Sequence, residues 1–174
     1  MKFKIQQASL IKALTVVNKN VALKPQLPIL GGILLEVSDQ QLILKTTDLY
    51  VGVQTKLPIK MSRAGKLVVP ANKFRPLIAA APKEELIIEV INNNCLVTSA
   101  NSRAELLSLP SSEFPDFPKV EEKPFLISTS DVKRISRLVA SSASTDQNRP
   151  ILNAVFFNFL GSNLEVVATD GVRM

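Results

Sequence analysis

The side chains in this sequence best suited to binding chemistry are the basic ones. Lys and Arg number 21 against 15 Asp and Glu in 174 residues, which gives a net charge of +6. Such an excess favours a polyanionic partner, although it also serves solubility. Evenly spread Lys and Arg contacts to phosphates bind nucleic acid without reading its sequence. The candidate phosphate contacts are Lys12, Lys19, Lys24, Lys73, Arg75, Lys133, Arg134, Arg137 and Arg149.

Residues for catalysis are scarce. The chain has no histidine, which excludes Ser-His-Asp and Cys-His catalysis and histidine-containing zinc sites. The one cysteine, Cys95, lies in an apolar run and is predicted to be a buried strand thiol in a reducing compartment. The six glycines form no phosphate-binding loop of the Walker or dinucleotide type. We therefore expect no catalytic residue, no metal and no cofactor.

A threonine and an aspartate recur after predicted strands, as Thr47-Asp48 and as Thr169-Asp170. The second pair continues into Gly171, and an Asp-Gly step is ordinarily a turn. Asp170 is therefore predicted to cap backbone amides rather than to catalyse, since no second carboxylate stands at metal-ligand spacing.

These motifs belong to an internal repeat. At an offset of 122 residues, residues 3–48 align with residues 125–170 without a gap. Phe3 falls on Phe125, the run Pro28-Ile29-Leu30 falls on residues 150–152, and the two Thr-Asp pairs coincide. The repeat predicts two copies of one fold.

Each copy is predicted to open with a short strand, at Phe3 and at Phe125, and to continue with an amphipathic helix. The apolar stripe of the first helix consists of Leu10, Ala13, Leu14, Val17 and Val21, with Lys12 and Lys19 on the opposite side. The second stripe consists of Val132, Ile135, Val139 and Ala143, and the helix is predicted to be capped by Ser130 or Asp131.

Hairpins follow the helices, over residues 33–37 with 42–45 and over residues 155–159 with 164–168. Residues 92–94 are predicted to form another hairpin turn. A second short helix is predicted over residues 73–81, with Pro76 tolerated in its first turn. The remaining predicted strands of the first copy are residues 51–57, 66–69, 85–91, 96–99 and 105–109.

The fold class is thus α+β, with antiparallel sheets and short helices on one face. A proline-punctuated stretch from Pro110 to Pro124 is predicted to be a linker between the copies. We expect one complete domain over residues 1–118 and the first part of a similar, truncated domain over residues 119–174. Such a half-domain leaves a sheet edge and an apolar face uncovered, so we expect a fragment of a longer protein, or a partner that completes the domain.

Six blocks of this sequence resemble the bacterial DNA polymerase III β subunit, the sliding clamp. They are Met1-Lys2-Phe3, Leu27-Pro28-Ile29-Leu30-Gly31, Thr47-Asp48-Leu49, Val69-Pro70-Ala71-Asn72-Lys73-Phe74, Leu109-Pro110 with Phe114-Pro115, and Ala168-Thr169-Asp170-Gly171-Val172-Arg173-Met174. The resemblance implies the clamp fold, in which two chains of three similar domains form a homodimer ring around double-stranded DNA. Helices line the pore in that family, so the basic residues named above would face DNA, with Lys24 and Arg149 close to it.

The resemblance also implies a hydrophobic pocket on the second domain for short peptides of the replicative polymerase, the clamp loader and other clamp-binding proteins. Matching positions are Arg149, Leu152, Thr169, Gly171, Val172, Arg173 and Met174. Family members commonly carry histidine where this chain has Val172, which makes the pocket rim less polar.

The predicted function is therefore that of a cytoplasmic, non-enzymatic DNA polymerase processivity factor. Low aromatic content, with one tyrosine and no tryptophan, favours duplex over single-stranded DNA, because single-strand binders stack bases on exposed rings. The alternative is a basic peptide-binding module that forms no ring. An enzyme ranks third, and no stretch approaches the length of a membrane span.

Overall fold

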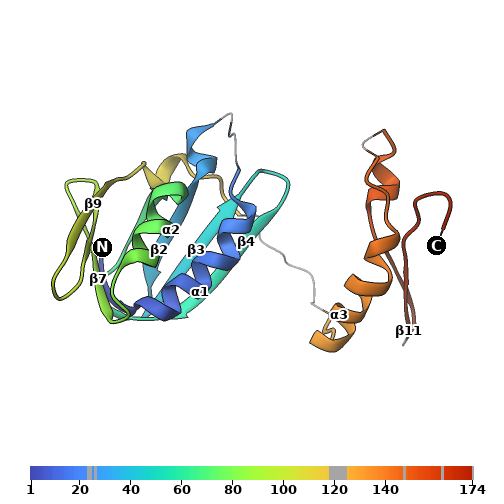
Figure 1. The fold of residues 1–174 in the computed structure, drawn as a ribbon, viewed down its shortest axis with the longest axis horizontal. Helices are drawn as coiled ribbons and strands as arrows, with labels where there is room; N and C mark the ends of the chain where they lie inside the picture. Colours follow the sequence, from blue (N-terminus) through green and yellow to red (C-terminus); the bar gives the residue numbers. More distant parts are fainter. Residues whose placement is uncertain (23–24, 26, 118–124, 147, 162, 174) are drawn as a thin grey trace. The chain divides into compact units, whose positions relative to one another are not determined.

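The protein is described here by a computed structural model that covers residues 1–22, 25, 27–117, 125–146, 148–161 and 163–173. The chain forms two compact units, Met1–Lys119 and Val120–Met174 (Figure 1). The predicted domain boundary between residues 118 and 119 falls in segment 118–124, outside the described residues.

Unit 1 contains two antiparallel sheets. The five-stranded sheet A has the order β5 (Lys60–Arg63), β1 (Lys2–Gln6), β7 (Glu85–Ile91), β8 (Asn94–Thr98) and β9 (Arg103–Leu107). The four-stranded sheet B has the order β4 (Gly52–Pro58), β3 (Gln41–Thr47), β2 (Gly32–Ser38) and β6 (Gly65–Pro70). The predicted α+β class is confirmed.

Strand β5 was not predicted, because its sequence Lys-Met-Ser-Arg lacks an alternating apolar pattern. It pairs with β1, so tertiary contact rather than local preference makes it a strand.

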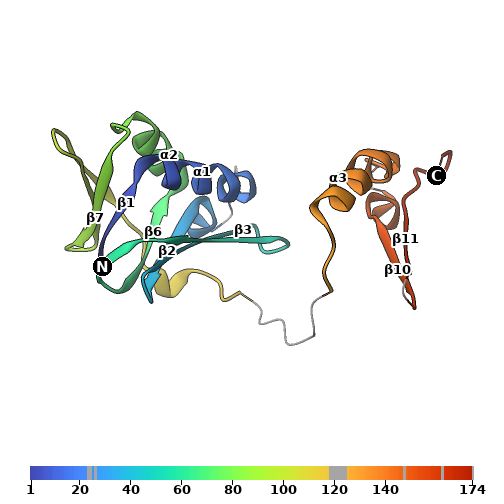
Figure 2. The same cartoon turned by 90° about the horizontal axis from the view of Figure 1, so that it is seen from below.

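Two helices, α1 (Gln7–Val17) and α2 (Ala71–Ala80), lie side by side over the sheets (Figures 1 and 2). Leu10, Leu14 and Val17 of α1 are fully buried, as are Phe74 and Ile78 of α2. The predicted α1 stripe is confirmed for Leu10, Ala13, Leu14 and Val17, which form one core with the inner faces of both sheets. Val21 was also predicted in the stripe, but it lies beyond the end of α1 and is partly buried against the same core. Burial of this apolar stripe, more than helix propensity, holds such short helices in place.

The explanation predicted for Pro76 is wrong. Helix α2 begins at Ala71, so Pro76 is its sixth residue and lies beyond the first turn. Its ring nitrogen cannot donate the hydrogen bond that an ordinary residue would make to the Asn72 carbonyl. Packing of Phe74 and Ile78 against the core offsets that loss.

The predicted hairpin turns are confirmed. Asp39 and Gln40 have φ of 50° and 58°, and Asn92 and Asn93 have φ of 49° and 63°. Two central residues with positive φ define the type I′ turn, whose twist matches that of the strands it joins.

The segment from Leu109 to Phe117 packs on the face of sheet B opposite α1 and α2 (Figure 2). Leu109 donates to and accepts from the backbone of Val68, at 2.8 and 3.4 Å. Phe114 is buried, and the ring of Phe117 lies 5.7 Å from Lys45 Nζ and against Gly52. The prediction that a linker begins at Pro110 is therefore wrong for residues 110–117, because these aromatic rings anchor them to unit 1.

Unit 2 contains α3 (Thr129–Leu138) and the antiparallel hairpin of β10 (Phe156–Leu160) and β11 (Asn163–Val167). Its helix is capped by Ser128, whose Oγ accepts from the Asp131 amide at 3.0 Å and donates to Asp131 Oδ2 at 2.6 Å. The predicted cap, Ser130 or Asp131, is wrong because the helix begins earlier, at Thr129.

The sequence repeat is also a structural repeat. The offset of 122 places α1 on α3, the short 3-10 helix Asn18–Asn20 on Ala140–Ser142, and Pro28–Gly31 on Pro150–Asn153. The β2–β3 hairpin falls on the β10–β11 hairpin. Each element of unit 2 thus has its counterpart in unit 1.

Equivalent apolar side chains are buried in unit 1 but not in unit 2. Val132 is 47% exposed, whereas Leu10 at the equivalent place has no exposed surface. Residues 125–128 form no strand, and Phe125 is 58% exposed. The predicted buried stripe and opening strand of the second copy are therefore wrong, since residues 125–173 include no counterpart of β5 and β7, which hold β1 in unit 1. A groove of about 560 Å³ opens instead between α3 and the hairpin.

Candidate nucleic-acid surface and peptide pocket

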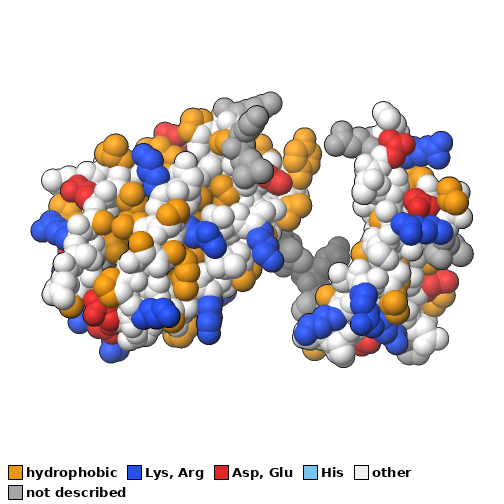
Figure 3. Space-filling model, in the orientation of Figure 1, with side chains coloured by type: hydrophobic (Ala, Val, Ile, Leu, Met, Phe, Trp, Pro, Cys, Tyr) orange, Lys and Arg blue, Asp and Glu red, His pale blue; other side chains and the backbone are white. Residues whose placement is uncertain are grey.

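Four predicted DNA contacts of unit 1 lie on one face. Lys12 lies on α1, Lys19 lies on the 3-10 helix after it, and Lys73 and Arg75 lie on α2. All are exposed except Arg75, which is half-buried. Figure 3 shows Lys and Arg side chains spread over the face that carries the two helices. Lys24 lies outside the described residues.

These four side chains differ from the basic residues of the sheets in how they are paired. On the sheets, Lys2, Lys4, Lys45, Lys60, Arg63 and Lys66 form ion pairs with Glu36, Glu85 and Glu89. Lys66 and Lys45 hold the pKa of Glu36 below its usual value. No ion pair among the described residues uses Lys12, Lys19, Lys73 or Arg75. Of the eight basic residues on the strands only Lys56 and Arg103 are unpaired within the described residues, whereas all four on the helix face are unpaired.

In unit 2, Lys133, Arg134 and Arg137 are exposed on α3. The repeat places Arg134 at the position of Lys12. None of the three takes part in an ion pair within the described part of the chain. Exposed cations therefore occur on the first helix of both copies.

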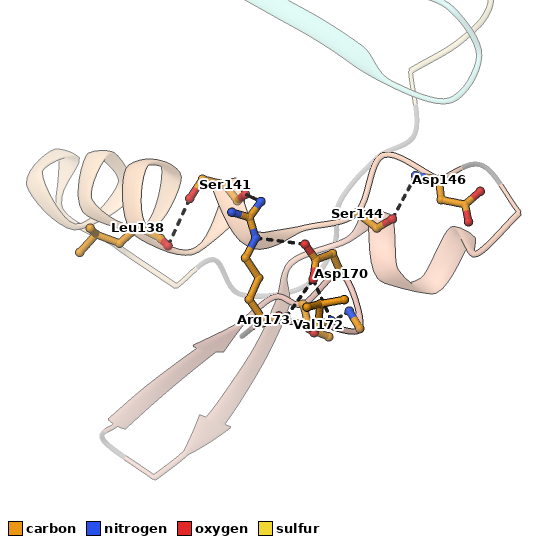
Figure 4. Close-up of polar contacts among 9 residues, drawn as sticks. Leu138, Ser141, Ser144, Asp146, Asp170, Val172 and Arg173 are labelled. Carbon is orange, nitrogen blue, oxygen red and sulfur yellow. Dashed lines mark hydrogen bonds and ion pairs between the residues drawn. The ribbon is translucent and has the colours of Figure 1, made fainter.

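Four of the seven predicted pocket residues, Thr169, Gly171, Val172 and Arg173, lie in one turn. Figure 4 shows Val172 and Arg173 of this turn around Asp170. The Thr169 hydroxyl donates to the Arg173 carbonyl at 2.7 Å and accepts from the Gly171 amide at 3.0 Å. Asp170 Oδ1 accepts from the amides of Val172 and Arg173 at 2.9 and 3.0 Å. Gly171 has a φ of 92°, a left-handed conformation that glycine adopts without strain.

The predicted role of Asp170 as a backbone cap is confirmed. The amides of Arg173 and Val172, together with the Arg173 guanidinium, hold the pKa of Asp170 below its usual value. A carboxylate kept ionised by fixed donors is poorly suited to proton transfer at neutral pH.

The side chains around the turn combine charge with apolar surface. Val172 is 95% exposed, and Leu152 is half-buried on the short helix Pro150–Asn153. A Cβ atom at Gly171 would lie 3.7 Å from Arg149 Nη1, so the structure places Arg149 beside the turn. Met174 lies outside the described residues. The arrangement can take an apolar side chain next to an anionic group.

Two features of this region were missed from the sequence. The groove of unit 2 is lined by Phe125, Leu126, Ile135, Leu138 and Phe159 among others, of which Ile135 was predicted to be buried. The contacts of Arg173 with Asp170 Oδ2 and with the Ser141 carbonyl, at 3.0 and 3.2 Å, were also missed. The i,i+3 spacing of Asp170 and Arg173 is the signal that could have indicated the first contact.

Three further features concern the reactivity of Cys95, metal binding and membrane insertion. Cys95 is buried on β8, and burial raises the pKa of its thiol to about 12, so the prediction of an unreactive strand thiol is confirmed. Across the described ranges, no cluster of Cys, Asp and Glu could hold a metal ion. No helix within those ranges is long and apolar enough to cross a membrane.

The fold is that of the sliding clamps. The structure superposes on DNA polymerase III subunit beta from Pseudomonas aeruginosa with a TM-score of 0.92 at 31% identity, over 98% of this chain and 47% of that one. It superposes on the sliding clamp of Bacillus subtilis with a TM-score of 0.93 at 28% identity, over 98% and 48%.

Sequence comparison identifies the family. The model of the DNA polymerase III beta subunit, N-terminal domain, matches residues 1–118, and the chain belongs to this family. It is 33% identical to the beta sliding clamp of Salmonella typhimurium and 32% identical to that of Escherichia coli K12, over 100% of this chain and 48% of each relative. The chain thus spans about half the length of the curated relatives it matches.

Proposed function

We propose that this chain supplies the first domain and part of the second domain of a bacterial sliding clamp. The clamp is a cytoplasmic processivity factor without catalytic activity, whose full-length homodimer encircles duplex DNA and tethers the replicative polymerase. The basic helix face of each domain points toward the DNA backbone. Contacts to phosphate alone let the protein translate along the duplex.

The observation that carries this proposal is the division of charge in unit 1. Glutamates pair with six of the eight basic residues on the strands of unit 1, all except Lys56 and Arg103. Lys12, Lys19 and Lys73 on the helix face stand in no ion pair within the described residues. A surface evolved only for solubility gains nothing from separating paired and unpaired cations between two faces. A surface for a polyanion requires the unpaired ones on the side of the ligand.

The test compares two triple variants of equal net charge. In one, Lys12, Lys19 and Lys73 become Gln; in the other, the ion-paired Lys2, Lys60 and Lys66 become Gln. Binding of a fluorescent duplex is measured by anisotropy over a series of salt concentrations. The helix-face variant should lower the slope of log affinity against log salt by about 0.9 for each phosphate that is no longer neutralised, and the sheet variant should leave the slope unchanged. Equal slopes in both variants would contradict the proposed DNA face.

Ring formation is tested on the longer protein. If the reading frame of the source gene continues past the codon for Met174, the full-length product is loaded on closed circular DNA. A ring stays bound until the circle is cut and then slides off the ends. Dissociation from intact and cut circles at the same rate would favour the alternative, a basic interaction module that forms no ring.

A second proposed activity is peptide binding at Arg149, Leu152, Thr169, Gly171, Val172, Arg173 and Met174. Support comes from the exposed apolar side chain of Val172 beside two guanidinium groups. Partners would be the polymerase, the clamp loader and other proteins with clamp-binding peptides. A clamp from Pseudomonas aeruginosa that is 34% identical over 98% of this chain has been crystallised bound to griselimycin. Griselimycin is therefore a suitable ligand for calorimetry, with Val172→Asp as the variant expected to weaken binding.

A further inference from the structure

The turn between β3 and β4 exposes three apolar side chains in a row. Tyr50 is 96% exposed, and its neighbours Leu49 and Val51 are 59% and 52% exposed. Single exposed apolar side chains are common on protein surfaces and need no explanation. A run of three costs solubility and indicates a surface that binds something.

Hydrogen bonds fix the backbone of this turn. Thr47 Oγ1 accepts from the Leu49 amide at 3.0 Å, and Asp48 Oδ1 accepts from the amides of Tyr50 and Val51 at 3.0 and 2.7 Å. Leu49 has a φ of 78°, a left-handed conformation that is unfavourable for leucine. The aromatic ring is thus presented from a fixed backbone, which reduces the entropy lost when a ligand binds.

The turn is tied to the end of α1 on both of its sides. Before the turn, Thr46 Oγ1 donates to the carbonyl of Val17, the last residue of α1, at 2.8 Å. After the turn, the Val51 carbonyl accepts from Asn20 Nδ2 at 2.6 Å. Asn20 follows Lys19 in the 3-10 helix Asn18–Asn20. The exposed ring therefore comes from a turn bonded to the segment that carries Lys19, an exposed cation of the helix face.

The second copy has the same turn without this combination of side chains. Its turn repeats the three hydrogen bonds to the backbone amides. The offset of 122 places Val172 at the position of Tyr50 and Ser141 at the position of Lys19. At these two positions the ring and the cation thus occur together in unit 1 and are absent together from unit 2, which indicates one ligand for both.

An aromatic ring beside a cation suits single-stranded nucleic acid, because a base stacks on the ring and the cation neutralises its phosphate. In a duplex the bases are already stacked on one another and only their edges are open in the grooves. The ring therefore indicates an unpaired base. Asp48 is the one acidic side chain in the turn, so the phosphate is expected on the side of Lys19.

We propose that Tyr50 stacks on an unpaired base of a single strand that continues from the bound duplex, while Lys19 contacts the phosphate of that strand. This inference rests on the proposed DNA-binding function and adds a second form of DNA to it. One ring supplies one stacking contact, so the duplex remains the main ligand, in agreement with the low aromatic content of the chain.

Three fluorescein-labelled probes separate base stacking from phosphate contact. They are a blunt duplex, the same duplex with a single-stranded thymidine tail, and the same duplex with an abasic tail that has the phosphates but no bases. The tail is attached to either strand end in turn, and affinity is measured by anisotropy. Tyr50→Phe keeps the ring, Tyr50→Leu keeps apolar surface without a ring, and Val172→Ala is the matched control in the turn of unit 2.

We expect the thymidine tail to bind about tenfold more tightly than the abasic tail. This preference should be kept in Tyr50→Phe and Val172→Ala and lost in Tyr50→Leu. Equal affinities for the two tails in the unaltered chain would overturn the stacking site. A preference retained in Tyr50→Leu would also overturn it, since the surface would then act through apolar contact and not through a ring.

A second readout separates this inference from the proposed function. Tyr50 is the one tyrosine of a chain without tryptophan, so intrinsic emission reports this ring alone. Unlabelled thymidine-tailed duplex should quench the emission, and the blunt and abasic probes should not, with N-acetyltyrosinamide as the control for absorption by DNA. Duplex binding with unchanged emission for every probe would overturn the site and leave the proposed function intact. Quenching by a thymidine oligomer in a chain that binds no duplex would support the site while the duplex function fails.

Discussion

Units 1 and 2 share one order of elements but not one core. Helix, 3-10 turns, hairpin and Thr-Asp turn recur at an offset of 122 residues. Yet Phe3 has no exposed surface, whereas its counterpart Phe125 is exposed. The hairpin and the turn are therefore set by contacts within about fifty residues, while burial of the helix stripe requires the strands and second helix that follow in unit 1.

The largest expected difference between the units is in hydrogen exchange. Amides of the β2–β3 hairpin exchange only through opening of a buried core, whereas those of β10–β11 lie in a two-stranded sheet. An isolated two-stranded hairpin is marginally stable in water. We expect protection factors about a thousandfold or more higher in β2–β3, measured by NMR or mass spectrometry. Equal protection would mean that unit 2 is stabilised by contacts outside the hairpin and α3.

One substitution made at equivalent positions sharpens the comparison. Val17 is fully buried, while Val139 is half-buried at the groove. Val17→Ala should lower the free energy of unfolding of unit 1 by about 2 kcal/mol, because it removes buried methyl groups and leaves a cavity. Val139→Ala should change the stability of unit 2 by less than about 0.5 kcal/mol. Urea denaturation followed by NMR signals of each unit measures both, and a reversed order would contradict the assignment of the cores.

A smaller change in stability is expected from substitutions at the residue with positive φ in each Thr-Asp turn. Leu49 has a φ of 78° and Gly171 a φ of 92°. Gly171→Ala has room for its Cβ but adopts a strained backbone, and should destabilise the turn by about 1 kcal/mol. Leu49→Gly relieves that strain and at the same time gains freedom in the unfolded chain, so its net effect should be near zero. A higher midpoint of urea denaturation for Gly171→Ala would contradict the predicted loss of stability.

The smallest expected effects are on titration. Backbone amides hold the pKa of both Asp48 and Asp170 below the ordinary Asp value, which is about 3.9. A depressed carboxyl pKa stabilises the folded turn above that ordinary value, and the stabilisation is lost as the pH falls through the folded pKa. Arg173→Ala should raise the pKa of Asp170 and leave that of Asp48 unchanged, as read from carboxyl chemical shifts. Parallel shifts of both would indicate that Arg173 acts through the fold and not through direct contact.

Features determined by residues close together in the chain could be predicted from the sequence. Asn92 and Asn93 predicted a turn, the stripe of Leu10, Leu14 and Val17 predicted a buried face, and Asp170 before Gly171 predicted a backbone cap. Strand β5 could not be predicted, because pairing with β1 defines it. Burial of Val132 was predicted wrongly, because periodicity identifies the side of a helix that can be covered and not whether a covering element is present.

For the candidate site, too, the residue types could be predicted from the sequence and the long-range contacts could not. The basic residues were visible in the sequence, but which of them lack acidic partners depends on sheet register, such as the placement of Glu36 beside Lys45 and Lys66. The tie between Arg173 and the Ser141 carbonyl joins residues far apart in the chain. The repeat offers a related contact in unit 1, where Val51, the counterpart of Arg173, is joined to Asn20, one residue after the counterpart of Ser141.

The segment that packs beneath sheet B also affects solubility. Strand β6 is an edge of that sheet, and an open edge is a template for pairing with another molecule and for aggregation. Leu109 occupies this edge through its two hydrogen bonds with Val68, and the rings of Phe114 and Phe117 hold it there. Residues 109–117 therefore protect the protein from self-association through β6, and their detachment would expose a strand edge and an apolar surface together.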